Sequence, residues 1–301
     1  MKAVIDMGTN TFHLLIGEVN NNPKEVIFRK TIPVKLGEGG GISRGEIIPT
    51  AYHRGIEALQ EFREIINNYP VNNIKATATA AIRDAQNGTN FIQDIFKLTQ
   101  IKVDIIDGQE EALYIYRGAL AANILSERTS LILDIGGGST EFIIANNQEI
   151  FWKDSFRLGA ARLLSDFYHS DPLKEMDLKS IENHLQNTLT PFFKAYNTFK
   201  PTELIGTAGA FDSYRDIILS AKEIDLNLIN YNFDFTEFIH LIDKLICSTH
   251  QERLLINGLI PLRTDMILMS SVMVKSLLNS TQITNVSASA YSLKEGLLFY
   301  P

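Results

Sequence analysis

The stretch LILDIGGGSTEFIIA at residues 131–145 decides the fold, because AVIDMGTNTFHLLIG at residues 3–17 repeats its pattern at a constant offset of 128 (131 − 3). In each copy a short apolar run ends at an aspartate, Asp6 or Asp134, and a glycine-containing turn leads into a second apolar run. Two apolar runs joined by a tight turn are typical of a β-hairpin. The sequence therefore predicts the same hairpin twice, which indicates an internal duplication.

The turn of each hairpin has the composition of an anion-binding site. Glycine lets the backbone approach a ligand without an intervening Cβ atom, and successive N–H groups in such a turn can form an anion-binding concavity. A single glycine-rich turn is often only a tight turn, but its repetition with aspartate at the same place favours a phosphate site. We therefore predict phosphate contacts from these residues: Gly8, Thr9, Asn10 and Thr11 in the first turn, and Gly136, Gly137, Gly138, Ser139 and Thr140 in the second.

The rest of the chain alternates apolar runs with segments of helical periodicity, which indicates an α/β fold. Predicted helices are 50–67, 90–98, 109–125, 160–167, 178–196, 235–248, 264–278 and 291–299, and further predicted strands are 74–77, 102–106, 203–206 and 283–286. We expect two related lobes, residues 1–125 and 126–288, with an interdomain cleft. Residues 289–301 are a candidate to complete the first lobe. The two aspartate-bearing turns are expected to face each other across the cleft.

Composition excludes several classes of protein. The 45% hydrophobic and 21% charged residues among 301 are typical of a soluble globular chain. The single cysteine, Cys247, cannot form an intrachain disulfide, and no apolar run approaches the ~18 residues of a membrane span. Asp6 interrupts the apolar N-terminal stretch, which argues against a signal peptide. We expect a cytoplasmic protein with no membrane partner.

The formal charge of −7 argues against nucleic acid as a partner, because nucleic-acid affinity usually needs a basic face. A polyanionic substrate would have to be held by a local concentration of donors.

Several motifs resemble the exopolyphosphatase / guanosine pentaphosphate phosphohydrolase family, within the superfamily of actin, sugar kinases and related ATPases. They follow the family's order over essentially the whole chain: IDMGTNTFHLLI at 5–16, KLGEG at 35–39, ATAAIRDAQNG at 78–88, DGQEEA at 107–112, LDIGGGSTE at 133–141, LGAARL at 158–163, GTAGAFDS at 206–213 and SLKEGLL at 292–298. The double hairpin alone fits the wider superfamily, whereas EEA together with AAIR is typical of this family. The resemblance implies a duplicated actin-like (ribonuclease H-like) α/β fold.

The chain departs from the family pattern in three places. Leu113 follows EEA where arginine is frequent, and Lys294 stands where arginine is common in the closing motif. The helical C-terminal region of longer members is absent, so the chain looks like the short, two-lobe form.

The family match implies that Glu111 is the general base. A carboxylate near a helix start is favoured in its ionised form, which is the form that accepts a proton from water. Acidic residues are also common in first helical turns without any catalytic role, and we interpret Glu110 in that way.

Arg83 ends a run of small residues that would let a ligand approach, and its guanidinium could bind phosphate oxygens in a two-pronged way. The competing interpretation is a surface salt bridge with Asp84. Gly209 lies in a further glycine turn after an apolar strand, which suits a phosphate contact at a helix N-terminus but also an ordinary connection. The stretch 35–41 is interpreted as a mobile loop that lines the substrate path or only connects.

Asp134 and Glu141 are the predicted ligands of magnesium or another divalent cation, with Asp6 contributing directly or through water. Magnesium prefers oxygen ligands and keeps several waters, so few carboxylates suffice. The competing interpretation of Glu141 is a solvent-facing strand residue. His13 occupies the equivalent place in the first copy, and a lone histidine on an apolar strand is more often packed than catalytic.

The resemblance predicts an exopolyphosphatase that hydrolyses terminal phosphate from inorganic polyphosphate by metal-assisted in-line attack of water. The alternatives are hydrolysis of guanosine pentaphosphate (pppGpp) or another nucleoside triphosphate, a sugar or acetate kinase, and a non-catalytic sensor of polyphosphate or nucleotide. The glutamate of EEA argues against the kinase. The family resemblance also suggests a homodimer.

Overall fold

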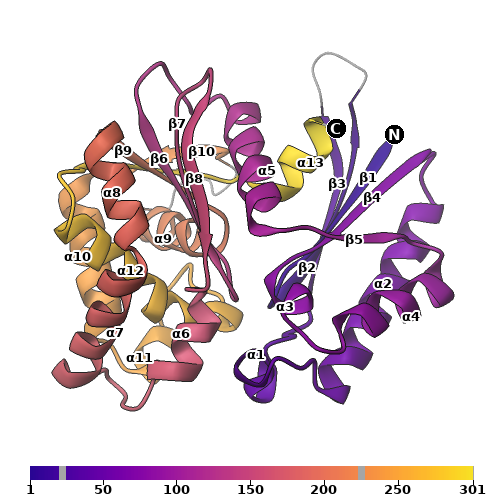
Figure 1. Ribbon diagram of the computed structural model, residues 1–301, viewed down its shortest axis with the longest axis horizontal. Helices are drawn as coiled ribbons and strands as arrows, with labels where there is room; N and C mark the ends of the chain where they lie inside the picture. Colours follow the sequence, from indigo (N-terminus) through magenta and orange to yellow (C-terminus); the bar gives the residue numbers. More distant parts are fainter. Residues whose placement is uncertain (20–24, 223–227, 301) are drawn as a thin grey trace. The chain divides into compact units, whose positions relative to one another are not determined.

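The computed structural model describes residues 1–19, 25–222 and 228–300, and at positions 42 and 43 only the backbone. The chain divides into two units by its internal contacts (Figure 1). Unit 1 comprises Met1–Ala121 together with Leu293–Pro301, and unit 2 comprises Ala122–Ser292. Each unit contains one mixed sheet and its own hydrophobic core, which confirms the α/β class. Within the described ranges, no helix is long and apolar enough to cross a bilayer.

Unit 1 is built on a five-stranded sheet of order β3-β2-β1-β4-β5, in which β1 runs antiparallel to β2 and parallel to β4. The strands are β1 (Lys2–Met7), β2 (Thr11–Glu18), β3 (Glu25–Pro33), β4 (Asn73–Ala78) and β5 (Val103–Ile105). The helices are η1 (Glu38–Gly40), α1 (Gly41–Arg44), α2 (Pro49–Asn67), α3 (Ala80–Arg83), α4 (Gly88–Thr99), α5 (Gly108–Ala121) and α13 (Leu293–Phe299).

Successive side chains of β1 point to opposite faces of the sheet, and this alternation keeps Asp6 apart from the core of unit 1. Ile5 and Met7 point to the face covered by α2 and α4, where they join Phe62 and Phe91 in one buried cluster. Because side chains alternate across a strand, Asp6 lies on the opposite face. The carboxylate at the end of β1 is thereby kept out of that core.

The last helix of the chain, α13, packs against β1, β2 and α5 (Figure 1). Its Gly296 lies so close to α5 that a Cβ atom there would come within 1.9 Å of the Tyr114 carbonyl oxygen. Glycine is therefore required for this close helix–helix approach. The C-terminal segment is an integral part of the first unit.

Unit 2 contains a six-stranded sheet of order β10-β11-β9-β6-β7-β8. The strands are β6 (Ser130–Ile135), β7 (Thr140–Ala145), β8 (Ile150–Phe156), β9 (Glu203–Thr207), β10 (Asn230–Asn232) and β11 (Asn285–Ser289). The helices are α6 (Ala160–Phe167), α7 (Glu175–Thr188), α8 (Thr190–Phe199), α9 (Ala208–Ala221), α10 (Phe235–Cys247), α11 (His250–Leu254), η2 (Pro261–Arg263) and α12 (Met266–Asn279). Helices α8 and α9 lie directly on the sheet, and α12 packs against α9.

The two hairpins are duplicated residue by residue. All six pairs of β1 and β2, from Lys2↔Gly17 onward, recur in β6 and β7 with 128 added to each number. Both copies also carry a register irregularity at the same place in the pairing with the next strand, between Ile16 and Gly17 and at the matching point of β7. The internal duplication predicted from sequence is confirmed in the backbone itself.

Several predicted elements were wrong or missing. The single helix predicted at 178–196 is two helices, α7 and α8, and Pro191 stands in the first turn of α8. Proline has no N–H for the helical ladder, so it favours a helix start over a helix interior. The helix predicted at 109–125 ends at Ala121. The strands β3, β8 and β10 and the helix α9 were not predicted.

Candidate active site

The turn between β6 and β7 is held from outside by the first residues of α6. The Ala160 N–H donates to the Gly136 carbonyl oxygen over 2.9 Å, and the Ala161 N–H donates to the Gly137 carbonyl oxygen over 3.0 Å. Helix N-termini have backbone donors without intrahelical partners, and here the glycine turn accepts their hydrogen bonds. The carbonyls of the turn are therefore directed toward α6.

The third carbonyl of this turn is held by a side chain. Arg162 Nε donates to the Gly138 carbonyl oxygen over 3.2 Å. In a planar trans peptide the C=O and the following N–H point in opposite directions. The N–H groups of Gly137, Gly138 and Ser139 therefore point away from α6, and no acceptor among the described residues takes a hydrogen bond from them. Three consecutive N–H groups directed to one side form a nest suited to an anion.

Close packing explains why glycine precedes α6. Gly159 is the N-cap residue of that helix, and a Cβ atom there would lie 2.2 Å from the carbonyl carbon and oxygen of Gly137. The same atom would lie 2.4 Å from the Gly138 nitrogen. The helix can therefore approach the turn only because position 159 has no side chain.

Thr140 differs from the other predicted residues of this turn. Its side chain is fully buried, and its hydroxyl donates to the Leu158 carbonyl oxygen over 3.0 Å. This hydroxyl helps to hold the segment before α6, so its predicted phosphate contact has no support from the side-chain geometry.

The turn between β1 and β2 is held in a similar way by a loop instead of a helix. The Gly8 N–H closes the turn on the Thr11 carbonyl oxygen over 3.1 Å. The amides of residues 34–36, which follow β3, donate to the Thr9 and Asn10 carbonyl oxygens over 2.8–2.9 Å. Both predicted phosphate turns therefore have carbonyl groups fixed by a neighbouring segment.

Two buried carboxylates lie opposite each other at the end of the second hairpin. Asp134 on β6 pairs in register with Glu141 on β7, and the two residues are 7% and 1% exposed. Cβ atoms of directly opposite residues are about 4.5–5.5 Å apart. Asp134 Oδ2 accepts hydrogen bonds from Thr207 Oγ1 over 2.8 Å and from the Ser292 hydroxyl, and Glu141 Oε1 accepts one from Ser155 Oγ over 2.7 Å.

These carboxylates fit a divalent cation by their chemistry. Two buried carboxylates side by side would repel one another, and a cation offsets that repulsion. Over the described part of the chain, no group of three or more His, Cys, Asp or Glu residues is arranged for a metal. Water and substrate oxygens would have to complete the coordination, as is usual for magnesium.

The first hairpin lacks the second carboxylate. Asp6 pairs in register with His13, whose Nε2 lies 2.9 Å from Thr11 Oγ1 and whose Nδ1 lies 2.9 Å from Thr31 Oγ1. The imidazole is thus engaged by two hydroxyls, one of which belongs to a predicted phosphate-binding residue. Asp6 is therefore the only carboxylate of the residue pair equivalent to Asp134 and Glu141.

Arg83 and Glu111 lie together in unit 1. Arg83 Nη1 is 3.3 Å from Glu111 Oε2 and donates to the Ile106 carbonyl oxygen over 3.0 Å. The longer contact of Arg83 Nε with Asp84, 3.8 Å, shows that the alternative ion pair is also present. Glu111 is buried in the first turn of α5, whereas its neighbour Glu110 is exposed. The structure therefore brings the predicted base and the predicted phosphate-binding arginine into contact.

The third glycine turn is in contact with an arginine that sequence analysis missed. Arg263 Nη1 donates to the Gly209 carbonyl oxygen over 2.6 Å and to Ser213 Oγ over 3.1 Å. Arg162 and Arg263 both contact carbonyl groups of glycine turns, and neither was selected from sequence. Arg162 stands within the LGAARL motif, and this membership was the available signal.

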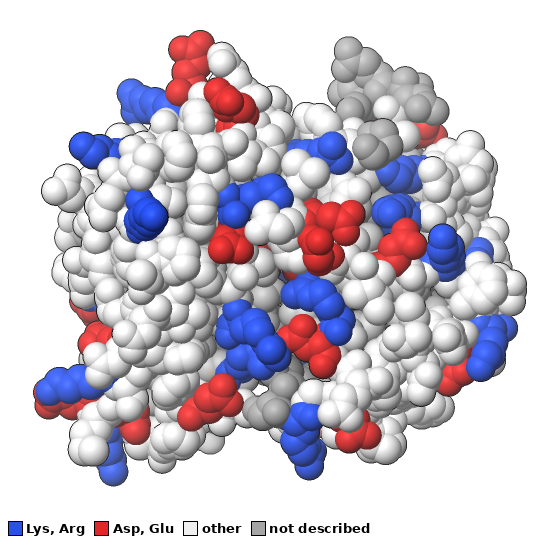
Figure 2. Space-filling model, viewed as in Figure 1, with Lys and Arg blue, Asp and Glu red and all other residues white. Residues whose placement is uncertain are grey.

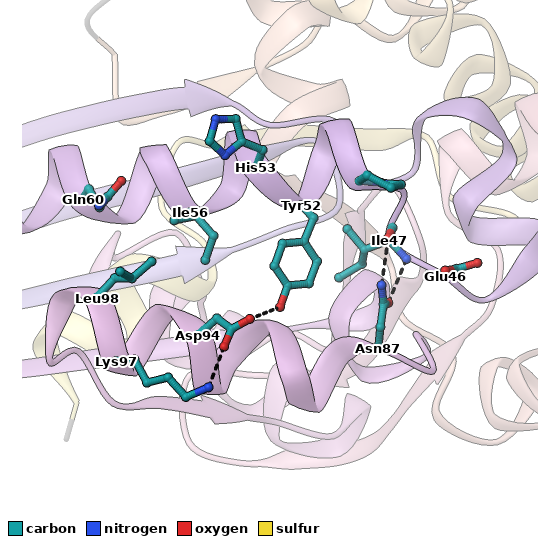
Figure 3. A pocket seen from close by; sticks show the side chains of 11 residues that line it. Glu46, Ile47, Tyr52, His53, Ile56, Gln60, Asn87, Asp94, Lys97 and Leu98 are labelled. Atoms are coloured by element: carbon teal, nitrogen blue, oxygen red, sulfur yellow. Dashed lines mark hydrogen bonds and ion pairs between the residues drawn. The ribbon is translucent and has the colours of Figure 1, made fainter.

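A separate hollow of about 660 Å³ lies between α2 and α4 (Figure 3). Tyr52 donates to Asp94 over 2.8 Å, and Lys97 donates to the same carboxylate over 2.8 Å. Burial and the hydrogen bond to Asp94 raise the pKa of Tyr52 to about 12, and the Lys97 hydrogen bond lowers the pKa of Asp94. These polar groups satisfy one another, and none of the predicted site residues lines the hollow.

A profile of the Ppx/GppA phosphatase family matches residues 15–300, nearly the whole chain. The chain belongs to the Ppx/GppA phosphatase family. Among solved structures, an exopolyphosphatase from Cytophaga hutchinsonii is similar to this Ppx/GppA chain with a TM-score of 0.95 and 39% identity. That similarity covers 99% of this chain and 96% of the other. The family resemblance and the actin-like fold expected from sequence are confirmed.

Curated relatives of this Ppx/GppA chain carry two kinds of name. A putative exopolyphosphatase of Haemophilus influenzae is 26% identical over 99% of this chain and 90% of its own length. A guanosine-5'-triphosphate,3'-diphosphate pyrophosphatase of Pseudoalteromonas atlantica is 26% identical over 99% of this chain and 58% of its own length. The chain therefore spans little more than half of the latter protein, and it spans 43% of another curated relative.

Proposed function

We propose that this protein is an exopolyphosphatase that releases terminal phosphate from inorganic polyphosphate by attack of water. The nest of N–H groups at residues 137–139, fixed by α6 and Arg162, carries this proposal. Net charge cannot hold a polyanion here, because the chain carries −7. Acidic and basic side chains are also intermixed on the face drawn in Figure 2. A local set of backbone donors meets that requirement.

Unit 1 supplies the proposed base and an arginine. Glu111 orients an attacking water and accepts its proton, and Arg83 neutralises phosphate oxygens. Contact with Arg83 favours the ionised form of Glu111, which is the form a base needs. We propose that these groups act on a phosphate chain held by the first turn, which belongs to the same unit.

Magnesium or another divalent cation is the proposed cofactor. Asp134 and Glu141 would hold it, with Asp6 contributing directly or through water. When bound, the ion would supply positive charge to the phosphate oxygens. The hydroxyls of Thr207, Ser292 and Ser155 support the carboxylate arrangement, because hydrogen bonds to ligands fix their orientation.

The base assignment is tested with Glu111→Gln, and Glu110→Gln is the matched control one residue away. We expect Glu111→Gln to keep its fold and to lower phosphate release from polyphosphate by about 10²–10⁴-fold, the usual contribution of a positioned base. The control should keep near-normal turnover, because Glu110 is exposed. Near-normal turnover in Glu111→Gln would refute the assigned base.

Hydrolysis of pppGpp is the second candidate, because a matched relative is named for that activity. Phosphate release from polyphosphate, pppGpp and other nucleoside triphosphates at equal concentration ranks these substrates. A kinase would transfer the phosphoryl group to an acceptor, so free phosphate that appears without any acceptor excludes it. A sensor would bind polyphosphate with no release of phosphate at all.

The homodimer and the cytoplasmic location stay predictions. Sedimentation of the purified chain tests the homodimer.

A further inference from the structure

The segment that follows β3 is tied to the first phosphate turn on one side and to α2 on the other. The Lys35 N–H donates to the Asn10 carbonyl oxygen over 2.9 Å. From α2, Arg54 donates through Nε to the Val34 carbonyl oxygen over 2.9 Å and through Nη2 to the Lys35 carbonyl oxygen over 3.3 Å. Both peptide groups of Lys35 are thus fixed, so its Cα atom has a defined place at the edge of the turn.

Lys35 adopts a backbone conformation that favours glycine. Its φ is +49°, in the left-handed region, where a residue with a Cβ atom costs roughly 1–2 kcal/mol. At the nearby positions Gly39 and Gly40, which also have positive φ, the chain uses glycine. Residues held in this region cluster at ligand sites, where the side chain has a use that offsets the strain.

The ammonium group of Lys35 is available for a ligand. The side chain is exposed, and it forms no ion pair or hydrogen bond with any residue that the structure describes. The acidic group nearest in sequence, Glu38, accepts from Arg54 Nη2 over 2.5 Å. By contrast, Lys30 on β3 pairs with Glu61 over 2.9 Å.

We propose that Lys35 is a substrate-binding residue whose ammonium contacts a phosphate group of a polyphosphate chain held at the first turn. The ammonium is a compact point charge with three donors, which suits phosphate oxygens without a fixed fork geometry. Its backbone N–H organises the turn, so one residue both shapes the anion site and adds charge to it. This inference rests on the proposed function, because it names a group that binds the same substrate.

Two variants at position 35 distinguish the effect of the lysine charge from the effect of backbone strain. Lys35→Asn removes the charge, and asparagine tolerates the left-handed region. Lys35→Arg keeps the charge. Lys102→Asn is the control, because Lys102 is an 85% exposed lysine of the same unit outside both turns. Each variant is assayed for KM and kcat on tripolyphosphate, and for tripolyphosphate binding by calorimetry without divalent cation.

We expect Lys35→Asn to raise KM and the dissociation constant for tripolyphosphate about tenfold, the size of one charge-assisted hydrogen bond, with kcat within about twofold. Lys35→Arg should stay within about threefold of the native values, and the control should be unchanged. The melting temperature of Lys35→Asn should not fall.

An unchanged dissociation constant for tripolyphosphate in Lys35→Asn overturns the role of the ammonium. An equal loss of affinity in Lys35→Arg overturns it as well. In both cases, hydrolysis of tripolyphosphate by the native protein leaves the proposed function standing. If the native protein binds tripolyphosphate without hydrolysing it, the proposed enzyme activity is refuted. The dissociation constants of the Lys35 variants, measured by calorimetry, still test the role of the ammonium. Absence of tripolyphosphate binding to the native protein overturns both.

Discussion

The hairpin β1–β2 and the hairpin β6–β7 share one backbone and differ in what surrounds it. Their six pairs have the same register, and their turns close through equivalent hydrogen bonds of 3.1 Å and 3.0 Å. In the first hairpin the carbonyls are held by a loop, and in the second by a helix N-terminus. The geometry proposed to bind an anion is thus a property of the backbone, and two different supports maintain it.

The side chains at the ends of the strands are not duplicated. The second hairpin pairs Asp134 with Glu141, and the first pairs Asp6 with His13. Thr207 donates to the carboxylate of the second copy over 2.8 Å, whereas the equivalent hydroxyl of the first copy reaches only a backbone carbonyl over 3.5 Å. Within the proposed function, we therefore expect both copies to bind phosphate and the second copy to contribute more to cation binding.

The largest expected asymmetry concerns the aspartates. We expect Asp134→Asn to lower magnesium-dependent phosphate release about 10³-fold, since a cation supplies several kcal/mol of charge stabilisation. Asp6→Asn should cost at most about 10²-fold, because Asp6 lies opposite His13 and not opposite a second carboxylate. Steady-state phosphate release over a magnesium titration measures both, and equal losses would contradict the asymmetry.

The support of the second turn is tested by Gly159→Ala. The added Cβ would meet the Gly137 carbonyl at 2.2 Å, so α6 must shift away from the turn. We expect about 10²-fold lower turnover and roughly 1–3 kcal/mol lower free energy of unfolding, as for other overpacked sites. Urea denaturation and phosphate release report the two quantities. Unchanged turnover would show that α6 is not needed to hold the turn.

Thr207 and Thr77, the equivalent hydroxyl residues beside the two hairpins, give a matched pair of predictions. Thr207→Val removes a donor to Asp134 and should weaken Mn²⁺ binding about 10–100-fold, as for other groups that orient metal ligands. Thr77→Val should change it less than about twofold, because its hydroxyl reaches only the Ile5 carbonyl over 3.5 Å. Calorimetric titration with Mn²⁺ distinguishes them, and similar losses in both would remove the proposed difference.

The smallest expected effect tests the shared backbone. A Cβ atom at Gly8 would lie 3.1 Å from the Thr11 carbonyl oxygen, and one at Gly136 would lie 3.0 Å from the Ser139 carbonyl oxygen. We expect Gly8→Ala and Gly136→Ala each to lower the free energy of unfolding by about 1 kcal/mol, since each contact needs only a slight shift. Urea denaturation of the two variants should agree within about 0.5 kcal/mol, and a larger gap would contradict the equivalence of the turns.

Local sequence patterns predicted the hairpins and many of the helices, because their apolar spacing is regular. The strands β3 and β8 were missed because each lies at the edge of its sheet, where only a short apolar run is followed by charged and polar residues. The single helix predicted at 178–196 shows that a proline signal was undervalued. The edge strands β3, β8 and β10 were missed, whereas the edge strand β5 was predicted, and the helix α9 was missed although one of its faces is buried.

The candidate site was predictable only in part. Glycine and aspartate marked the turns, but the groups that hold them lie far away in sequence. Thr207 and Ser292 reach Asp134 from 73 and 158 residues away. Such contacts arise from packing and have no local pattern. The amides of residues 34–36 and 160–161 likewise act through backbone atoms, which carry no residue signature.

The return of α13 to unit 1 sets an order of events during synthesis. The strands β1 and β2 leave the ribosome early, whereas the helix that covers them is made only after all of unit 2. Domains generally fold as units during synthesis, starting from the N-terminus. In this protein the unit that is made first must wait for residues 293–299, so unit 2 can finish folding before unit 1.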